Sequence, residues 1–151
     1  MLMNQPHPST PASTDASLAA ALRMAVGRLA RRLRAQRPDS SLSLGQGSAL
    51  FTLARHGTMT PGALADHDKV QPPSMTRIIA ALEERGLVRR RRHPDDGRQQ
   101  LVEITEEGIQ LVQADHQRRE AWLTRQLAEL SHEDKEVLRR AAEIMDRLSQ
   151  S

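Results

Sequence analysis

The sequence predicts a mainly α-helical fold with one small β-hairpin. Large aromatic side chains are nearly absent, with one Phe, one Trp and no Tyr, so the core depends on aliphatic residues that suit helices packed on helices. Apolar residues recur at spacings of three and four over most of the chain, which is the helical pattern. The spacing becomes strand-like only on either side of Pro94-Asp95-Asp96-Gly97, a strong turn sequence.

The N-terminal part divides into a tail and a helix. Residues 1–14 contain prolines among small polar residues, and such a segment buries too little apolar surface to offset the entropy lost on ordering. We therefore expect a disordered tail over 1–14 and a single domain over 15–151. The first helix is predicted to begin at a cap, Asp15 or Ser17, and to end at Pro38.

Capping signals define three further helices. Ser43 caps a helix that runs to about residue 56, and Thr60-Pro61 is an N-cap followed by proline at the first helical position. The fourth helix is predicted from Pro72-Pro73 to residue 85, with Gly86 as its C-terminal cap. The apolar residues expected to pack in the core are Leu50, Phe51, Leu53, Met75, Ile78, Ile79 and Leu82.

The remaining elements are a hairpin and two helices. Residues 87–93 and 99–105 are the two strands expected around the turn. A long helix follows Thr105, and a final helix begins at Ser131, with Asp134 three residues further on.

The net charge is only +3, from 22 basic and 19 acidic residues, but its distribution is uneven. Six arginines and no acidic residue lie in 23–37, and six arginines with only two acidic residues lie in 85–98. Concentrated basic charge is what a polyanion-binding surface requires. Solvated surfaces are the simpler alternative, above all for the first stretch.

Several classes of function are disfavoured. The absence of Cys excludes disulfides, thiolate metal sites and thiol-based redox sensing. No metal-ligand spacing such as His-x-x-x-His links His56, His67, His116 and His132, and a meeting of Asp66, Asp68 and His116 in the fold stays open as the alternative. We expect no metal, no cofactor and no enzymatic activity, because no catalytic triad pattern, phosphate loop or nucleotide-binding motif is present. No apolar run approaches the ~20 residues of a membrane span and no signal peptide opens the chain, so we expect a cytoplasmic protein without a membrane partner.

The order of the central elements indicates DNA binding. A short helix, a turn and a second helix are followed by an Arg-rich hairpin. The second helix of such a pair can enter the major groove, where base edges carry a readable pattern. Hairpin arginines can reach the sugar-phosphate backbone or the minor groove. We therefore predict a winged helix-turn-helix region over residues 43–108 that binds double-stranded DNA.

Motifs within this region resemble one family. Residues 70–79 (VQPPSMTRII) and 82–88 (LEERGLV) resemble the recognition helix and its exit in the MarR (multiple antibiotic resistance regulator) family of transcriptional regulators. Asp95-Asp96-Gly97-Arg98 followed by 101–108 (LVEITEEG) resembles that family's wing, and the whole resemblance covers roughly residues 17–148. The chain departs from the family where Asp68-Lys69 replaces the usual apolar-Gly pair, because a left-handed turn is costlier without Gly.

The resemblance implies a triangular homodimer. Helices within 15–38 and 109–151 would interlock as the dimerisation region, and the two winged regions would read a pseudo-palindromic operator. The expected interface residues are Leu18, Leu22, Leu29, Leu33, Ile144, Met145 and Leu148.

Four candidate DNA contacts lie on the fourth helix. Pro73, Ser74, Thr76 and Arg77 are left outward-facing once the apolar positions point inward. By the resemblance, Ser74, Thr76 and Arg77 contact base edges or nearby phosphates. An ordinary first-turn hydroxyl is the alternative for Ser74.

Four more candidates lie in the hairpin. By the resemblance, Arg98 enters the minor groove while Asp96 holds its guanidinium, and a turn-stabilising surface pair is the alternative. Residues 89–92 alternate along a strand, so only about two of them, here Arg90 and Arg92, can face DNA together. The others are expected to meet solvent or an acidic group such as Glu103.

The resulting prediction is a ligand-responsive repressor. A small phenolic or drug-like effector would bind between the winged region and the dimerisation helices and change the separation of the recognition helices. Three alternatives stay open: a protein-binding winged-helix adaptor, a non-specific architectural DNA-binding protein, and an activator.

Overall fold

A computed structural model describes residues 11–36 and 42–151 of the chain. These residues fall into two compact units divided between Gln36 and Arg37, and each unit is described by itself. The mainly helical fold with a small two-stranded hairpin is confirmed. Among the described residues, no helix combines the length and apolar content that crossing a membrane requires.

The first unit contains the helix α1 (Pro11–Arg34). It begins earlier than the expected cap at Asp15 or Ser17, so residues 11–14 are helical rather than part of a tail. Proline suits the first turn of a helix because its φ is already helical and its missing N–H would have had no partner there. Residues 1–10 of the predicted tail, and the predicted helix end at Pro38, lie outside the described residues.

The second unit begins with two helices whose predicted caps are confirmed. α2 (Leu44–His56) is capped by Ser43, which accepts from the Gln46 amide at 3.1 Å while the Gln46 side chain accepts from the Ser43 amide at 3.2 Å. α3 (Pro61–Asp68) is capped by the Thr60 hydroxyl, 3.1 Å from the Ala63 amide. Reciprocal or single caps of this kind satisfy amides that the first helical turn leaves without partners.

The helix α4 (Pro72–Glu84) follows α3 after a short turn. Lys69 in this turn adopts the left-handed conformation, with φ 53° and ψ 45°. The expected cap Gly86 is also left-handed, with φ 72°, and its amide donates to the Glu83 carbonyl at 2.9 Å. Both ends of α4 are therefore set by local backbone geometry.

The hairpin consists of β1 (Val88–Arg92) and β2 (Gln100–Ile104), paired antiparallel from Val88↔Ile104 to Arg92↔Gln100. A further bridge, absent from our sequence analysis, joins Met59 to Val102 through backbone bonds of 3.1 and 2.8 Å. This bridge attaches the hairpin to the segment that precedes α3.

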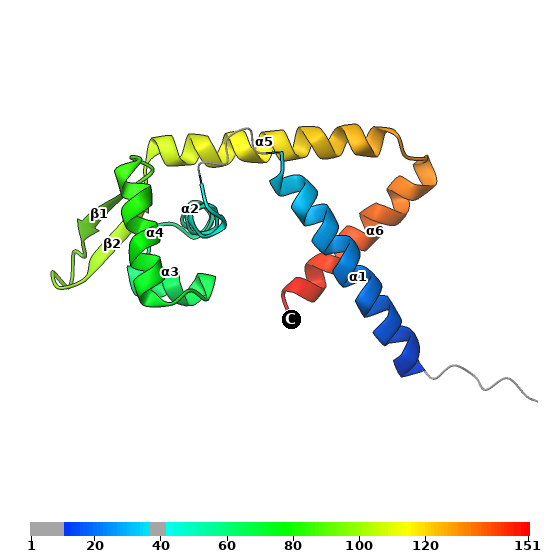
Figure 1. Cartoon of the computed structure of the whole chain (residues 1–151), viewed down its shortest axis with the longest axis horizontal. Coiled ribbons are helices and arrows are strands. Elements are labelled where there is room, and N and C mark those ends of the chain that lie inside the picture. Colours follow the sequence, from blue (N-terminus) through cyan, green and yellow to red (C-terminus); the bar gives the residue numbers. More distant parts are fainter. Residues whose placement is uncertain (1–10, 37–41) are drawn as a thin grey trace, which may run out of the picture. The chain divides into compact units, whose positions relative to one another are not determined.

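The core of the second unit lies between α2, α3, α4 and the hairpin (Figure 1). Its largest fully buried side chains are Leu50, Leu53, Leu64, Met75, Ile79, Leu82, Val88 and Val102. The expectation that Phe51 is a core residue is wrong, because it lies 39% exposed and forms a T-shaped contact with the His116 ring instead. Position 51 faces the middle of the long helix that follows the hairpin rather than the centre of the core.

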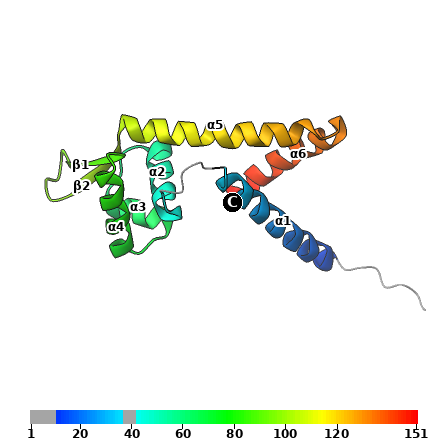
Figure 2. The same ribbon diagram turned by 45° about the horizontal axis from the view of Figure 1, so that its top comes forward.

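That long helix is α5 (Glu106–Ala128), and α6 (His132–Ser149) follows it. Figures 1 and 2 show α5 extending away from the hairpin and the other core helices. Only its beginning packs on the core, through Leu111 and Val112. Ser131 caps α6 by accepting from the Asp134 amide at 3.1 Å, as predicted.

Candidate nucleic-acid interface

The outward face of α4 carries the four predicted residues together. Pro73, Ser74, Thr76 and Arg77 are all exposed, while Met75 and Ile79 on the opposite face are buried. Because the apolar face of α4 is packed in the core, the helix is held in place while its polar face is exposed to solvent. The Thr76 hydroxyl donates to the Pro72 carbonyl at 3.0 Å, which leaves its oxygen lone pairs available to accept from a partner.

The first turn of α4 has few backbone amides that need a capping side chain. Gln71 is the N-cap residue, yet its side chain forms no capping hydrogen bond among the described residues. Pro72 and Pro73 have no N–H, and the Met75 amide already donates to the Gln71 carbonyl at 3.0 Å. The Ser74 amide is therefore the one amide of this turn still without a helical acceptor, and it lies beside the exposed Ser74 hydroxyl.

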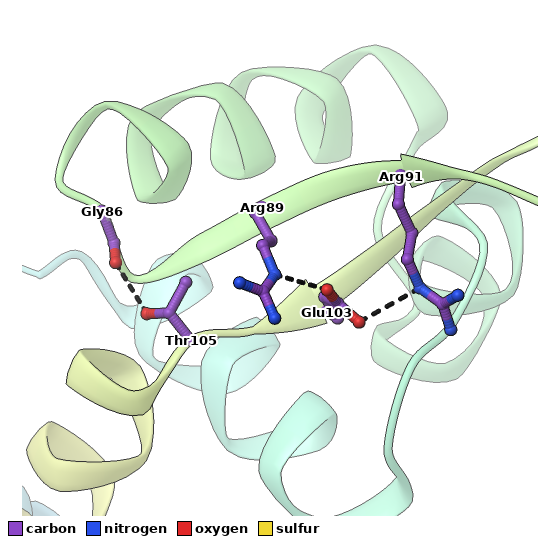
Figure 3. A network of polar contacts seen from close by, with 5 residues as sticks. All are labelled: Gly86, Arg89, Arg91, Glu103 and Thr105. Carbon is purple, nitrogen blue, oxygen red and sulfur yellow. Dashed lines mark hydrogen bonds and ion pairs between the residues drawn. The ribbon is translucent and has the colours of Figure 1, made fainter.

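One face of the hairpin carries a carboxylate paired with two arginines (Figure 3). Glu103 pairs with Arg89 through one carboxylate oxygen and with Arg91, at 3.1 Å, through the other. The hydrogen bond from Arg89 is the main reason that the pKa of Glu103 lies below its ordinary value of 4.5. Desolvation opposes this lowering, and the charges of Arg89 and Arg91, with the hydrogen bond from Arg91, add to it. The other strand arginines were expected to meet solvent or an acidic group such as Glu103, and in the structure both Arg89 and Arg91 pair with Glu103.

The other face of β1 carries Arg90 and Arg92, the pair predicted to face DNA. Arg90 is half-buried, with its Nε 3.5 Å from Glu83 of α4 and its Nη1 3.3 Å from Gln100. Arg92, nearer the tip, is exposed. Arg90 therefore links the hairpin to the end of α4, a connection that the sequence analysis missed because Glu83 and Arg90 belong to different elements.

The hairpin tip is held by backbone contacts. Asp96 accepts from the backbone amide of Arg98 at 3.1 Å, so the recorded bond is to the amide rather than to the guanidinium that we expected. His93 Nδ1 accepts from the amides of Asp95 and Asp96 at 3.1 and 3.2 Å. The Arg98 side chain is exposed at this tip. His93 was not among the predicted site residues, although its place directly before the turn was a usable signal.

The arrangement provides one helix with an exposed polar face and, beside it, an Arg-rich hairpin joined to that helix through Arg90. Among residues 11–36 and 42–151, no cluster of three or more His, Cys, Asp or Glu residues is arranged to hold a metal ion. The exposed side chains of α4 and the hairpin provide hydrogen bonds and positive charge, which suit phosphates and base edges.

Comparison with known proteins agrees with this geometry. The model of the MarR family matches residues 42–99. An HTH-type transcriptional regulator of Mycobacterium bovis is 52% identical over 132 residues, which cover 87% of this chain and 92% of that protein. The chain belongs to the MarR family. It is therefore an HTH-type DNA-binding regulator of transcription, as predicted.

Solved MarR-type structures share the fold. A transcriptional regulator protein from Pseudomonas aeruginosa superposes with a TM-score of 0.84 at 29% identity, over 95% of this chain and 99% of that chain. A point mutant of MepR from Staphylococcus aureus, bound to an oligodeoxyribonucleotide, superposes with a TM-score of 0.67 at 21% identity, over 88% of this chain and 96% of that chain. The winged helix-turn-helix assignment is confirmed by these likenesses.

Proposed function

We propose that this MarR family protein is a sequence-specific repressor that binds a pseudo-palindromic operator as a homodimer. The observation that carries the proposal is the exposed face of α4, where Ser74, Thr76 and Arg77 stand clear of an apolar face locked in the core. Short polar side chains and an arginine on a rigid helix are suited to reading base edges. The DNA-bound MepR mutant supports this use of the shared fold.

The hairpin supplies the second contact in this proposal. Exposed Arg92 and Arg98 reach the backbone or minor groove, whereas Arg89 and Arg91 are already paired with Glu103. Arg90 supports the hairpin through Glu83 and contacts DNA only at its exposed end. Asp96 acts on Arg98 through the backbone amide, which fixes where the arginine leaves the turn.

Homodimer formation is supported by apolar side chains that each unit leaves exposed. In α1 these are Leu18, Leu22, Met24, Val26 and Leu29, and in α6 they are Val137, Leu138, Ile144, Met145 and Leu148. Leu33 of α1, also predicted at the interface, is half-buried. Rows of apolar residues left in water favour association with a second chain.

Regulation by a small phenolic or drug-like molecule completes the proposal. Two recognition helices in a dimer must lie about one turn of DNA apart, ~34 Å. An effector that binds more tightly to a dimer with another spacing therefore weakens operator binding without touching DNA. We further propose that the protein acts in the cytoplasm and carries no enzymatic activity, in line with its relatives being transcriptional regulators.

Titration against DNA tests this proposal. The purified full chain is titrated with a duplex from its own upstream intergenic region and with a scrambled duplex, at two salt concentrations. We expect tight binding to the first and a large preference over the second. Equal, strongly salt-dependent binding to both would indicate an architectural DNA-binding protein. No binding to either would favour a protein-binding adaptor, and the position of the bound site relative to the promoter separates a repressor from an activator.

A further inference from the structure

The turn between α3 and α4 contains a buried carboxylate. The side chain of Asp68, the last residue of α3, is only 3% exposed. Its Oδ1 accepts from the hydroxyl of Thr52, a buried residue of α2, at 2.8 Å, and lies 3.2 Å from Nδ1 of His67. One oxygen atom thus joins α2 to the point where the chain leaves α3.

Three features make this arrangement costly when each is taken alone. A carboxylate at the C-terminal end of a helix meets the negative end of the helix dipole. Oδ2 of Asp68 is buried and has no hydrogen-bond partner among the described residues. The next residue, Lys69, is left-handed although it is not glycine. An apolar side chain at 68 and a glycine at 69 would remove all three unfavourable effects.

Backbone hydrogen bonds connect this turn to the end of α3. The Lys69 amide donates to the Asp66 carbonyl at 3.3 Å, and the Val70 amide donates to the Ala65 carbonyl at 2.9 Å. The Val70 side chain packs against the core. Only Gln71 then separates this turn from Pro72, the first residue of α4. Any rotation of the turn therefore changes the direction in which α4 leaves it.

We propose that Asp68 and Thr52 are positioning residues for the recognition helix: their hydrogen bond fixes the left-handed turn against α2 and so sets the direction of α4. Locally unfavourable geometry persists where the surroundings and the function require it. The bond contributes to discrimination between DNA sequences because base-edge hydrogen bonds depend on the placement of α4. This inference rests on the proposed function as a sequence-specific DNA-binding protein.

Two variants of one residue separate positioning from simple structural support. Thr52→Val keeps the side-chain shape and removes the donor, whereas Thr52→Ser keeps the donor and is the matched control. Each full-length variant is titrated with the upstream intergenic duplex and with the scrambled duplex. The quantity compared is the dissociation constant for the scrambled duplex divided by that for the intergenic duplex. A loss of folded protein weakens the apparent binding to both duplexes equally and leaves this ratio unchanged.

We expect the ratio to fall about tenfold in Thr52→Val, the factor that corresponds to one lost hydrogen bond. Thr52→Ser should retain a ratio within about threefold of the unmodified protein, since the hydroxyl is kept. An unchanged ratio in a Thr52→Val protein that circular dichroism shows to be folded would overturn the positioning role.

Hydrogen exchange tests the same bond without DNA. The exchange rate of the Val70 amide should rise about tenfold in Thr52→Val and stay near the original in Thr52→Ser, because the turn opens more often without the donor. An unmodified protein that shows no preference between the duplexes would count against the proposed function. In that case an accelerated Val70 amide still assigns Thr52 and Asp68 to the turn, and an unchanged rate overturns the inference as well.

Discussion

The hydroxyl of Thr105 donates a 2.6 Å hydrogen bond to the carbonyl oxygen of Gly86. Gly86 is the left-handed residue at which the chain leaves α4, and Thr105 is the N-cap of α5 (Figure 3). The same hydroxyl oxygen accepts from the Gly108 amide at 3.2 Å. One side chain therefore joins the exit of α4 to the start of α5.

Replacing Thr105 tests this junction. Thr105→Val removes both the cap and the bond to Gly86 while keeping a similar shape. We expect a loss of about 1–2 kcal/mol in the free energy of unfolding, measured by denaturant titration. Thr105→Ser retains the hydroxyl and serves as the control. Equal stability of the Val and Ser variants would show that the hydroxyl contributes nothing at this position.

Gly108 allows α5 to begin close to the hairpin exit. A Cβ built at this position would lie 2.3 Å from the Leu87 carbonyl oxygen and 2.6 Å from Cγ1 of Ile104. Because backbone cannot yield as a side chain can, Gly108→Ala should lower the free energy of unfolding by about 1–3 kcal/mol. The matched control is Gly62→Ala in α3, where a Cβ meets nothing within 4 Å and no loss is expected. Thermal or denaturant unfolding of the two variants side by side checks this difference.

The pairing of Glu103 with Arg89 and Arg91 predicts a gain of DNA affinity on mutation. Glu103→Gln removes a negative charge from the hairpin and should tighten binding to operator and scrambled duplexes alike. The logarithmic salt dependence should change by less than about 1, the value for one added phosphate contact, because Arg89 and Arg91 lie on the face of β1 opposite Arg90 and Arg92. Fluorescence anisotropy titrations over a range of salt concentrations measure both quantities. A slope steeper by about 1–2 would show that the face carrying Arg89 and Arg91 contacts phosphates as well, and weaker binding would contradict the expected gain.

The lowered pKa of Glu103 sets the pH range of that effect. Folding favours the ionised carboxylate, so its stabilising contribution is complete above the ordinary value of 4.5 and is lost as the pH falls through the lower folded pKa. The affinity difference between the original protein and Glu103→Gln should therefore be constant at neutral pH. It should shrink only in acid, because the original protein then loses the same charge. A difference that already changes near neutrality would contradict the assigned pKa direction.

Arg98 at the hairpin tip is expected to be the strongest single DNA contact of the wing. Arg98→Ala should weaken operator binding markedly without changing helix content or the oligomeric state, which sedimentation and circular dichroism report. Arg125→Ala, an exposed arginine of α5, is the matched loss of one positive charge. If the two variants bind operator equally well, the tip has no special role.

Arg77 on α4 tests base readout. If its guanidinium contacts a base edge, Arg77→Ala should reduce the preference for operator over scrambled DNA by about 1–3 kcal/mol. Paired titrations with the two duplexes give this difference. An equal loss on both duplexes would assign Arg77 to a phosphate contact instead.

Elements defined by local chemistry could be predicted from the sequence. Ser43, Thr60 and Ser131 cap their helices as expected, since each cap depends on residues within one turn. The hairpin followed from its turn residues and from the alternation of its strands. The exposed row on α4 followed from the spacing of its apolar residues.

Features that depend on contacts between distant parts of the chain could not be predicted from the sequence. The bridge between Met59 and Val102, the half-exposed position of Phe51 and the pair Arg90–Glu83 each arise from how separate elements pack. The departure at Asp68-Lys69 was visible in the sequence as a costly turn. The hydrogen bond from Thr52 to Asp68, which stabilises this turn, depends on the packing of α2 against α3 and has no signal in the sequence.

We propose that α4 and the hairpin read DNA together within a dimer. The most direct test is a hydroxyl-radical and methylation footprint of the full chain, and of Arg98→Ala, on the upstream intergenic duplex. We expect two protected major-groove patches with centres about one helical turn apart, ~34 Å, each flanked by minor-groove protection that disappears in Arg98→Ala. A uniform footprint without discrete half-sites, or one that Arg98→Ala leaves intact, would contradict this proposal.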